Sequence, residues 1–204
     1  MVMMDIAIPN GNEDLFISMA ERLGYRELML LYDSSKFAEM QNIQPNSKIK
    51  ISLGILAQQR DMQKIKSKFK GHFIAAKSSD SDRDIMEKQY ADLIFSLEEA
   101  SRKDFMHQRG SGLDNILAKL AHDNNVSIGF SISSLLNSKN KNMIMGRMMQ
   151  NIRLCRKYKT KMVIASFSAS PYQMRSPHDI ISLFAGLGMS SREAKESLTL
   201  ERFK

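Results

Sequence analysis

Several residue types are rare or absent in this chain of 204 residues. It has no tryptophan, and its one cysteine, Cys155, excludes an internal disulfide framework and fits a reducing compartment. No run of about 18 apolar residues is present, so no membrane-spanning helix is expected. The first residues lack a basic segment followed by a long apolar one, and we therefore expect no secretory signal. With 43% hydrophobic residues to bury in a core, the chain is expected to be a globular cytoplasmic protein.

A further absence is local. Residues 124–178, the acid-free segment, contain no Asp or Glu, although nine of the 30 Lys and Arg residues lie there. Outside the segment 21 basic residues face 22 acidic ones, so the net charge of +8 belongs to the segment alone. Solvated helix faces usually mix both signs, whereas a local field of one sign is typical of proteins that bind phosphate. The segment therefore predicts nucleic-acid contact, with a merely solvated outer helix as the alternative.

Short apolar runs alternate with helical patterns along the chain. Such runs are typical of parallel strands covered on both faces, as in open doubly wound sheets and (β/α) barrels. No glycine-rich phosphate fingerprint follows the first run, which favours the barrel. No eighth strand is visible, so we expect an α/β fold, an irregular TIM-like barrel, with residues 1–204 as a single domain. The seven expected strands are residues 5–8, 28–32, 49–56, 73–76, 93–95, 126–132 and 162–167.

The longest expected helix spans about residues 140–158. One face is apolar and the charged residues lie away from it, which predicts a buried inner face and a cationic outer one. Cys155 is expected to be buried filler rather than a reactive thiol. Ile144, Met148, Ile152 and Cys155 form the apolar face, Arg147 and Arg156 flank it, and Gln150, Arg153 and Lys157 point oppositely.

Few residues are candidates for catalysis. The carboxyl ends of barrel strands carry the active sites of such folds, and here they offer Asp33, Lys77 and Glu98. Of the four histidines only His107 falls in a loop of this kind, and no histidine has a second ligand at metal-site spacing. No Gly-x-Ser-x-Gly motif is present. We therefore expect neither a metal site nor a catalytic nucleophile.

A loop that ends in Arg109-Gly110-Ser111-Gly112 combines cations, glycines and a hydroxyl. The glycines allow backbone amides to approach an anion, and Ser111 is a candidate cap for the next helix. A structural Gly-Ser-Gly hinge is the equal alternative. A further short helix is expected at residues 37–43, before Pro45.

Four blocks of sequence carry a resemblance. They are residues 104–121 (DFMHQRGSGLDNILAKLA), 126–136 (VSIGFSISSLL), 148–158 (MMQNIRLCRKY) and 163–177 (VIASFSASPYQMRSP). In this order they resemble the TIM-barrel protein subunit family of archaeal ribonuclease P, protein component 3, which is homologous to the thirty-kilodalton subunit of the eukaryotic enzyme. The resemblance covers essentially the whole chain and is strongest from Asp104 onward.

The resemblance implies an irregular α/β barrel in a ribonucleoprotein that removes the 5′ leader from precursor tRNA. In that particle the RNA carries catalysis and its Mg²⁺ ions, so the subunit is expected to hold no cofactor and to be inactive alone. Its implied partners are the ribonuclease P RNA, precursor tRNA, other ribonuclease P proteins and a small ferredoxin-like subunit, paired in one heterodimer or in two.

The matched motifs assign RNA contact to Arg109, Arg147, Arg153 and Arg175. The charge pattern adds further predicted contacts at Arg156, Lys157 and Lys77. Asp114 departs from the family, in which Asn is frequent at this position, and adds negative charge beside Arg109. The alternative function is a free-standing barrel phosphoesterase that acts on a small phosphorylated substrate through His107, Asp33 or Glu98.

Overall fold

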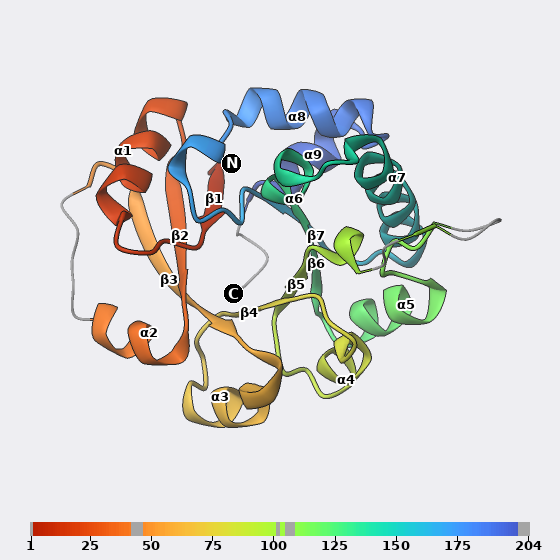
Figure 1. Cartoon of the computed structure of the whole chain (residues 1–204), viewed down its shortest axis with the longest axis horizontal. Coiled ribbons are helices and arrows are strands. Elements are labelled where there is room, and N and C mark those ends of the chain that lie inside the picture. The colour runs from red at the N-terminus through yellow and green to blue at the C-terminus, as the bar shows by residue number, and fades with distance from the viewer. Residues whose placement is uncertain (1, 42–46, 101–102, 105–108, 200–204) are drawn as a thin grey trace.

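Seven parallel strands form the centre of the fold and lie side by side in the order of the chain (Figure 1). The computed structural model describes residues 2–41, 47–100, 103–104 and 109–199. The parallel pairing that the apolar runs predict is confirmed for each neighbouring pair. The strands are β1 (Met4–Ala7), β2 (Glu27–Tyr32), β3 (Lys50–Ala57), β4 (Ile74–Lys77), β5 (Leu93–Phe95), β6 (Ser127–Ser131) and β7 (Met162–Ala165).

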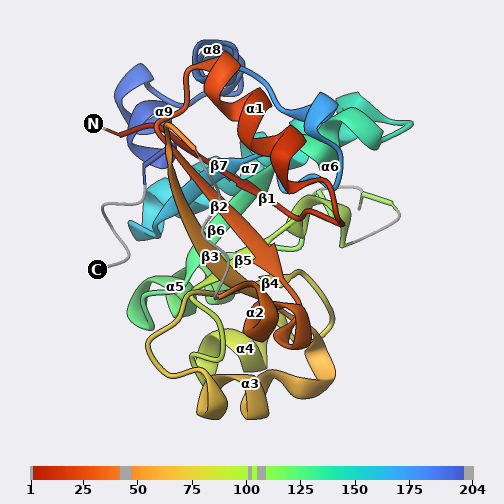
Figure 2. The same cartoon turned by 90° about the vertical axis from the view of Figure 1, so that its left-hand side faces the viewer.

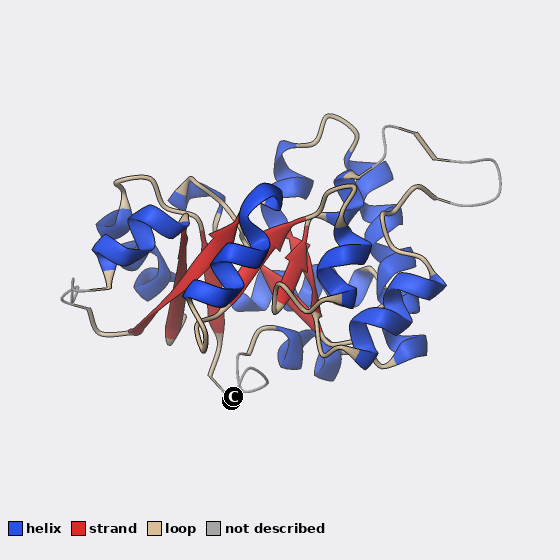
Figure 3. Ribbon diagram, turned by 90° about the horizontal axis from the view of Figure 1, so that it is seen from below, coloured by secondary structure: helices blue, strands red, loops and turns tan. Residues whose placement is uncertain are grey.

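Helices follow the strands and cover the outside of the sheet (Figure 3). Helices α1, α8 and α9 lie along one side of the barrel, and α3 and α4 lie along the opposite side (Figure 2). None of the described helices is long and apolar enough to cross a bilayer. The helices are α1 (Glu13–Leu23), α2 (Ser34–Met40), α3 (Met62–Lys68), α4 (Asp82–Glu87), α5 (Asn115–Asp123), α6 (Ile132–Asn137), α7 (Lys141–Tyr158), α8 (Pro177–Gly186) and α9 (Ser191–Ser197), with 3₁₀ turns η1 (Gln59–Asp61), η2 (Leu97–Glu99) and η3 (Pro171–Gln173).

The barrel closes where the residues after β7 meet β1. The Phe167 N–H donates to the Ile6 carbonyl at 2.8 Å, and the Ile8 N–H donates to the Ser168 carbonyl at 2.9 Å. One residue earlier in both segments, a side chain replaces the main-chain acceptor: Asp5 Oδ1 accepts the Ser166 N–H at 2.6 Å. The expected irregular TIM-like barrel is therefore confirmed, and its described part is nearly closed with seven strands.

Apolar side chains fill the barrel interior. Phe95 and Phe167 stack at its carboxyl end, with ring centroids 4.3 Å apart and planes within 5°. A Cβ atom on Gly129 would lie 2.7 Å from the Phe95 Cβ, so glycine on β6 leaves room for this stack. Two further apolar clusters lie between the sheet and the helices, one mainly under α1 to α5 and one under α6 to α9.

Two local predictions are corrected by capping. The helix expected at residues 37–43 begins at Ser34, because Asp33 Oδ1 accepts the N–H groups of Ser35 and Lys36; residues 42 and 43 lie outside the described part. The strand expected to reach residue 132 ends at Ser131, whose hydroxyl accepts the Ser134 N–H and starts α6. The pattern of apolar residues does not show these two boundaries, because a carboxylate cap sets the first and a hydroxyl cap sets the second.

The Asp5 carboxyl makes stability depend on pH. Burial raises its pKa to about 6, although hydrogen bonds from Ser166 and Ile6 act against the rise. The folded chain then binds a proton more tightly than the unfolded chain, so the free energy of unfolding falls as pH rises from about 4 to about 6. In the Asp5→Asn variant this decrease in the free energy of unfolding should be smaller by up to about 3 kcal/mol. Urea unfolding at several pH values measures it.

Part of the remaining pH dependence should come from Glu98, which is fully buried and whose pKa burial raises to about 7. An Asp5→Asn variant with an unchanged slope below pH 6 would contradict the prediction.

Candidate nucleic-acid interface

Helix α7 turns one face to the core and one to the outside. Asn140 caps its first turn by accepting the Met143 N–H. The predicted apolar face is confirmed, because Ile144, Met148, Ile152 and Cys155 are all buried. Burial raises the pKa of the Cys155 thiol to about 12, which fits packing rather than reactivity.

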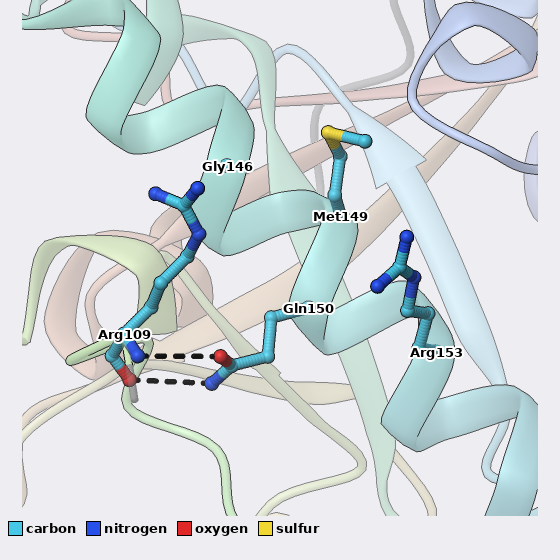
Figure 4. A pocket seen from close by; sticks show the side chains of 5 residues that line it. All are labelled: Arg109, Gly146, Met149, Gln150 and Arg153. Atoms are coloured by element: carbon cyan, nitrogen blue, oxygen red, sulfur yellow. Dashed lines mark hydrogen bonds between the residues drawn. The ribbon is translucent and has the colours of Figure 1, made fainter. Parts of the chain in front are cut away.

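A cleft of about 190 Å³ opens against the outer side of α7 (Figure 4). Arg109, from the loop before α5, and Arg153, from α7, supply its two guanidinium groups, and both residues are exposed. Met149 adds an apolar wall and Gln150 an amide. The structure therefore brings together two of the arginines that the sequence proposes, although 44 positions separate them in the chain.

The carboxamide of Gln150 fastens the Arg109 loop to α7. Its Nε2 donates to the Arg109 carbonyl at 3.2 Å, and the Arg109 N–H faces its Oε1 at 3.4 Å (Figure 4). The same Nε2 lies 2.7 Å from the Ser111 hydroxyl, and Asn151 Nδ2 donates to the Ser111 carbonyl at 2.9 Å. These bonds satisfy loop main-chain groups with side-chain partners on the helix.

Gly146 creates the space in which the Arg109 side chain lies. A Cβ atom at this position would be 2.5 Å from Arg109 Cζ, closer than any unstrained contact. Glycine therefore lets the guanidinium lie against the helix backbone. Sequence reasoning missed this residue, although a glycine inside a helix, which costs about 1 kcal/mol relative to alanine, was an available signal.

Arg147 is a structural residue in this fold. Its side chain is 0% exposed, its Nε donates to Asp104 Oδ1 at 2.8 Å, and its Nη1 donates to the Glu98 carbonyl at 2.9 Å. RNA contact by Arg147 stays a prediction, and its guanidinium has no exposed surface in the described structure. A helical-wheel pattern places Arg147 at the edge of the apolar face but does not show the Asp104 carboxylate that binds it.

The other predicted cations lie outside the cleft. Arg156 binds both Glu193 carboxylate oxygens, at 2.8 and 2.9 Å, and so ties α7 to the start of α9. Lys77 pairs with Glu99 Oε2 at 2.8 Å. Arg175 donates from Nη1 to the Met174 carbonyl at 2.7 Å and remains exposed. RNA contact by these three residues stays a prediction.

Lys157 continues the row that Arg153 begins. It lies one helical turn farther along α7, with Nζ 3.4 Å from Asn115 Oδ1 and 5.0 Å from the Tyr158 ring centroid. The exposed row of Arg153 and Lys157, with Arg109 beside it, is the candidate interface. Its chemistry suits a polyanion bound from the outside of the barrel.

Two amides of the loop at residues 109–112 have partners inside the protein, because the Ser111 N–H donates to the Arg109 carbonyl at 2.9 Å and the Gly110 N–H is also bonded. The Gly110 N–H donates to Asp104 Oδ1 at 3.0 Å, and Gly112, at φ +73°, packs against the Leu97 carbonyl. Asp114, not Ser111, caps α5 by accepting the Leu117 N–H at 2.7 Å. The hinge interpretation of this loop is therefore the better one, and the acid at position 114 has a structural purpose.

Two of the three residues named for a phosphoesterase, Asp33 and Glu98, lie in the described part of the chain, and both make structural contacts there. Asp33 caps α2, and Glu98 is buried with Oε1 on the Ser131 N–H at 3.3 Å. His107 lies outside the described residues. Within the described ranges no group of three His, Cys, Asp or Glu side chains is arranged to hold a metal ion.

Comparison with known sequences gives consistent matches. The model of the RNase P subunit p30 family matches residues 2–202. The ribonuclease P protein component 3 of Methanothermobacter thermautotrophicus is 26% identical over 196 residues, which is 88% of this chain and 77% of the relative. The component 3 of Thermococcus kodakarensis is 37% identical over 93 residues, 45% of this chain and 42% of the relative.

Solved structures share the fold. A chain in a cryo-EM structure of archaeal ribonuclease P with mature tRNA superimposes with a TM-score of 0.77 at 19% identity, over 96% of this chain and 86% of that one. A crystal structure of a prolidase complexed with N-methylphosphonate-L-proline gives 0.58 at 8% identity, over 97% and 74%. An overall fold similar to this one is thus found in proteins of different kinds.

Replacing Gly146 by alanine tests how Arg109 is seated. The variant should raise the free energy of unfolding by about 0.5–1 kcal/mol through helix propensity, because the group displaced is the flexible end of an exposed arginine. Urea unfolding measures the stability, and the Arg109 Nε–H resonance reports the displacement. Gly186→Ala, at a position with no atom within 4 Å of the new Cβ, is the matched control. A loss of stability at 146 but not at 186 would contradict this account.

Proposed function

The chain belongs to the RNase P subunit p30 family, and from this premise we propose that it supports the removal of the 5′ leader from precursor tRNA as a protein subunit of ribonuclease P. The observation that carries the mechanism is the candidate interface: Arg109, Arg153 and Lys157 present positive charge on the outside of the barrel. Cations on a rigid helix and a fastened loop are suited to positioning a phosphate backbone without reading its sequence.

The distribution of ion pairs supports this assignment. Among the described residues, Lys77, Arg156 and Arg109 each have a carboxylate partner, which for Arg109 is Asp104 at 3.4 Å, whereas Arg153 and Lys157 have none within 4.0 Å. An arginine without a carboxylate partner keeps its full charge for a ligand, and its planar guanidinium binds phosphate oxygens bidentately. Each phosphate neutralised releases counterions, so this surface should bind RNA with strong salt dependence.

In this proposal the protein contributes binding and the RNA contributes chemistry. Among the described carboxylates at the carboxyl ends of the strands, Asp33 caps a helix, Glu98 is buried and Glu99 pairs with Lys77. We expect the subunit to hold no cofactor of its own, and we assign the Mg²⁺ ions of the reaction to the RNA. Cleavage is then an activity of the assembled ribonucleoprotein and not of the isolated chain.

The proposal extends to assembly. We infer that the subunit contacts the ribonuclease P RNA and precursor tRNA, joins other ribonuclease P proteins, and pairs with a small ferredoxin-like subunit in one or two heterodimers. A location in the cytoplasm follows from the same proposal, because tRNA processing takes place there in cells without a nucleus.

Purification from the native cell at low salt tests the whole proposal. A tagged chain should retain one structured RNA and several small basic proteins, and the eluate should cleave precursor tRNA when Mg²⁺ is present. Addition of ribonuclease before elution is the control, since it should abolish cleavage. A protein that elutes free of RNA and of ribonuclease P proteins would refute the proposed function.

Variants of two arginines about one helical turn apart distinguish an effect on RNA binding from an effect on stability. Arg153→Ala should lower the slope of log affinity for RNA against log salt concentration by about 0.9 and leave the melting temperature unchanged. Arg156→Ala should lower the slope by less than Arg153→Ala does, because Glu193 already pairs the Arg156 guanidinium, and it should lower the free energy of unfolding by about 1 kcal/mol through loss of that half-exposed bidentate pair. Filter binding at several salt concentrations and thermal melts measure both. Equal slopes for the two variants would place the RNA elsewhere.

A further inference from the structure

Three donors converge on the carboxylate of Asp104. They are Nε of Arg147 at 2.8 Å, the Gly110 N–H at 3.0 Å and Nη1 of Arg109 at 3.4 Å. Two of these donors are arginines, one buried and one exposed in the cleft. Asp104 is therefore the physical link between the protein core and the cation that faces the ligand.

We propose that Arg147 is a positioning residue, which acts through Asp104 to hold the Arg109 guanidinium in place for an RNA phosphate. The proposal rests on the proposed function, because it concerns the same RNA-binding cleft. The proposal gives Arg147, a buried cation on α7, a role that does not require contact with RNA. Arg147 and Asp104 touch no RNA in this scheme.

The anchor is rigid at its inner end. Arg147 is fully buried, and its Nη1 donates to the carbonyl of Glu98 on η2. The Glu98 carboxylate in turn accepts the Ser131 N–H at the end of β6. Arg147 thus connects the barrel frame to the Arg109 loop, and a planar guanidinium with two directed donors fixes orientation as well as distance.

The outer end is guided from three sides. Asp104 attracts the Arg109 guanidinium by charge, the absent side chain of Gly146 gives it a seat on α7, and Gln150 holds the Arg109 main chain. Burial alone would raise the pKa of Asp104, but hydrogen bonds from Arg147 and Gly110 and the charges of both arginines outweigh it, so its pKa lies below the ordinary value. Asp104 therefore keeps its charge at neutral pH.

A variant of Asp104 separates positioning from simple charge, because the two effects have opposite signs. If Asp104 only repelled RNA, Asp104→Asn would tighten binding by removing a negative charge beside the interface. Positioning instead predicts binding about fivefold weaker, with the salt slope lowered by about one unit, because Arg109 is no longer held. Asp123→Asn, at an exposed acid at the end of α5, is the charge-matched control and should bind as tightly as the parent or more tightly.

The experiment is a double-mutant cycle with Arg109→Ala. The full chain and its variants are titrated with in vitro transcribed ribonuclease P RNA from the same genome, and thermal melts are recorded for each. In the Arg109→Ala background, Asp104→Asn should cause no further loss of affinity, even where it lowers the melting temperature. If Asp104→Asn does not fold, Arg147→Lys, which keeps the charge but not the fork of donors, takes its place in the cycle.

Two results would overturn the positioning role. One is unchanged or tighter RNA binding by Asp104→Asn. The other is an equal loss of affinity in both backgrounds, which is the outcome of a merely structural change. Failure of the parent chain to bind this RNA would instead refute the proposed function, and the positioning role with it.

Discussion

Closing a barrel with seven strands leaves main-chain groups at the β1–β7 seam that need partners, and this constraint organises much of the molecule. Asp5 supplies an acceptor for Ser166, and the N–H of Met4 donates to the Leu198 carbonyl after α9. The seam therefore fixes α9 against the barrel. Helix α9 presents Glu193 to Arg156, and that ion pair fixes one end of α7, so the orientation of the helix that carries the candidate interface depends on how the barrel closes.

Identical charges have different uses in this fold. Arg147 and Arg156 hold elements together, whereas Arg153 and Lys157 are exposed without carboxylate partners among the described residues. Surface ion pairs contribute little to stability on average. Removing the partner of a buried arginine, in contrast, strongly destabilises the folded state because it leaves an unpaired charge in the core. The acid-free segment thus contains both paired and unpaired cations, and the acids that pair Arg147 and Arg156 come from other segments of the chain.

The barrel is used here as a scaffold. In barrel enzymes the carboxyl ends of the strands carry the chemistry. In this protein those ends hold stacked phenylalanines, capping side chains and the buried Glu98, while the cationic cleft lies outside, between α7 and the loop before α5. The similarity to a prolidase concerns the fold alone. The proposed role as an RNA-binding subunit needs no catalytic group at these strand ends, and it is compatible with exposed cations on a helix and a fastened loop outside the barrel.

The sequence by itself determined the parallel barrel, the buried face of α7 and the position of the positive charge, because these follow from local periodicity and composition. It also supplied the family resemblance. Only the tertiary structure decided which cations are exposed. Arg109 and Arg153 line the same cleft although 44 positions separate them in the chain, and Arg147 is buried and paired with Asp104. The physical reason is that burial and ion pairing depend on contacts between distant segments. Periodicity places a side chain on a face of a helix, and packing determines what covers that face.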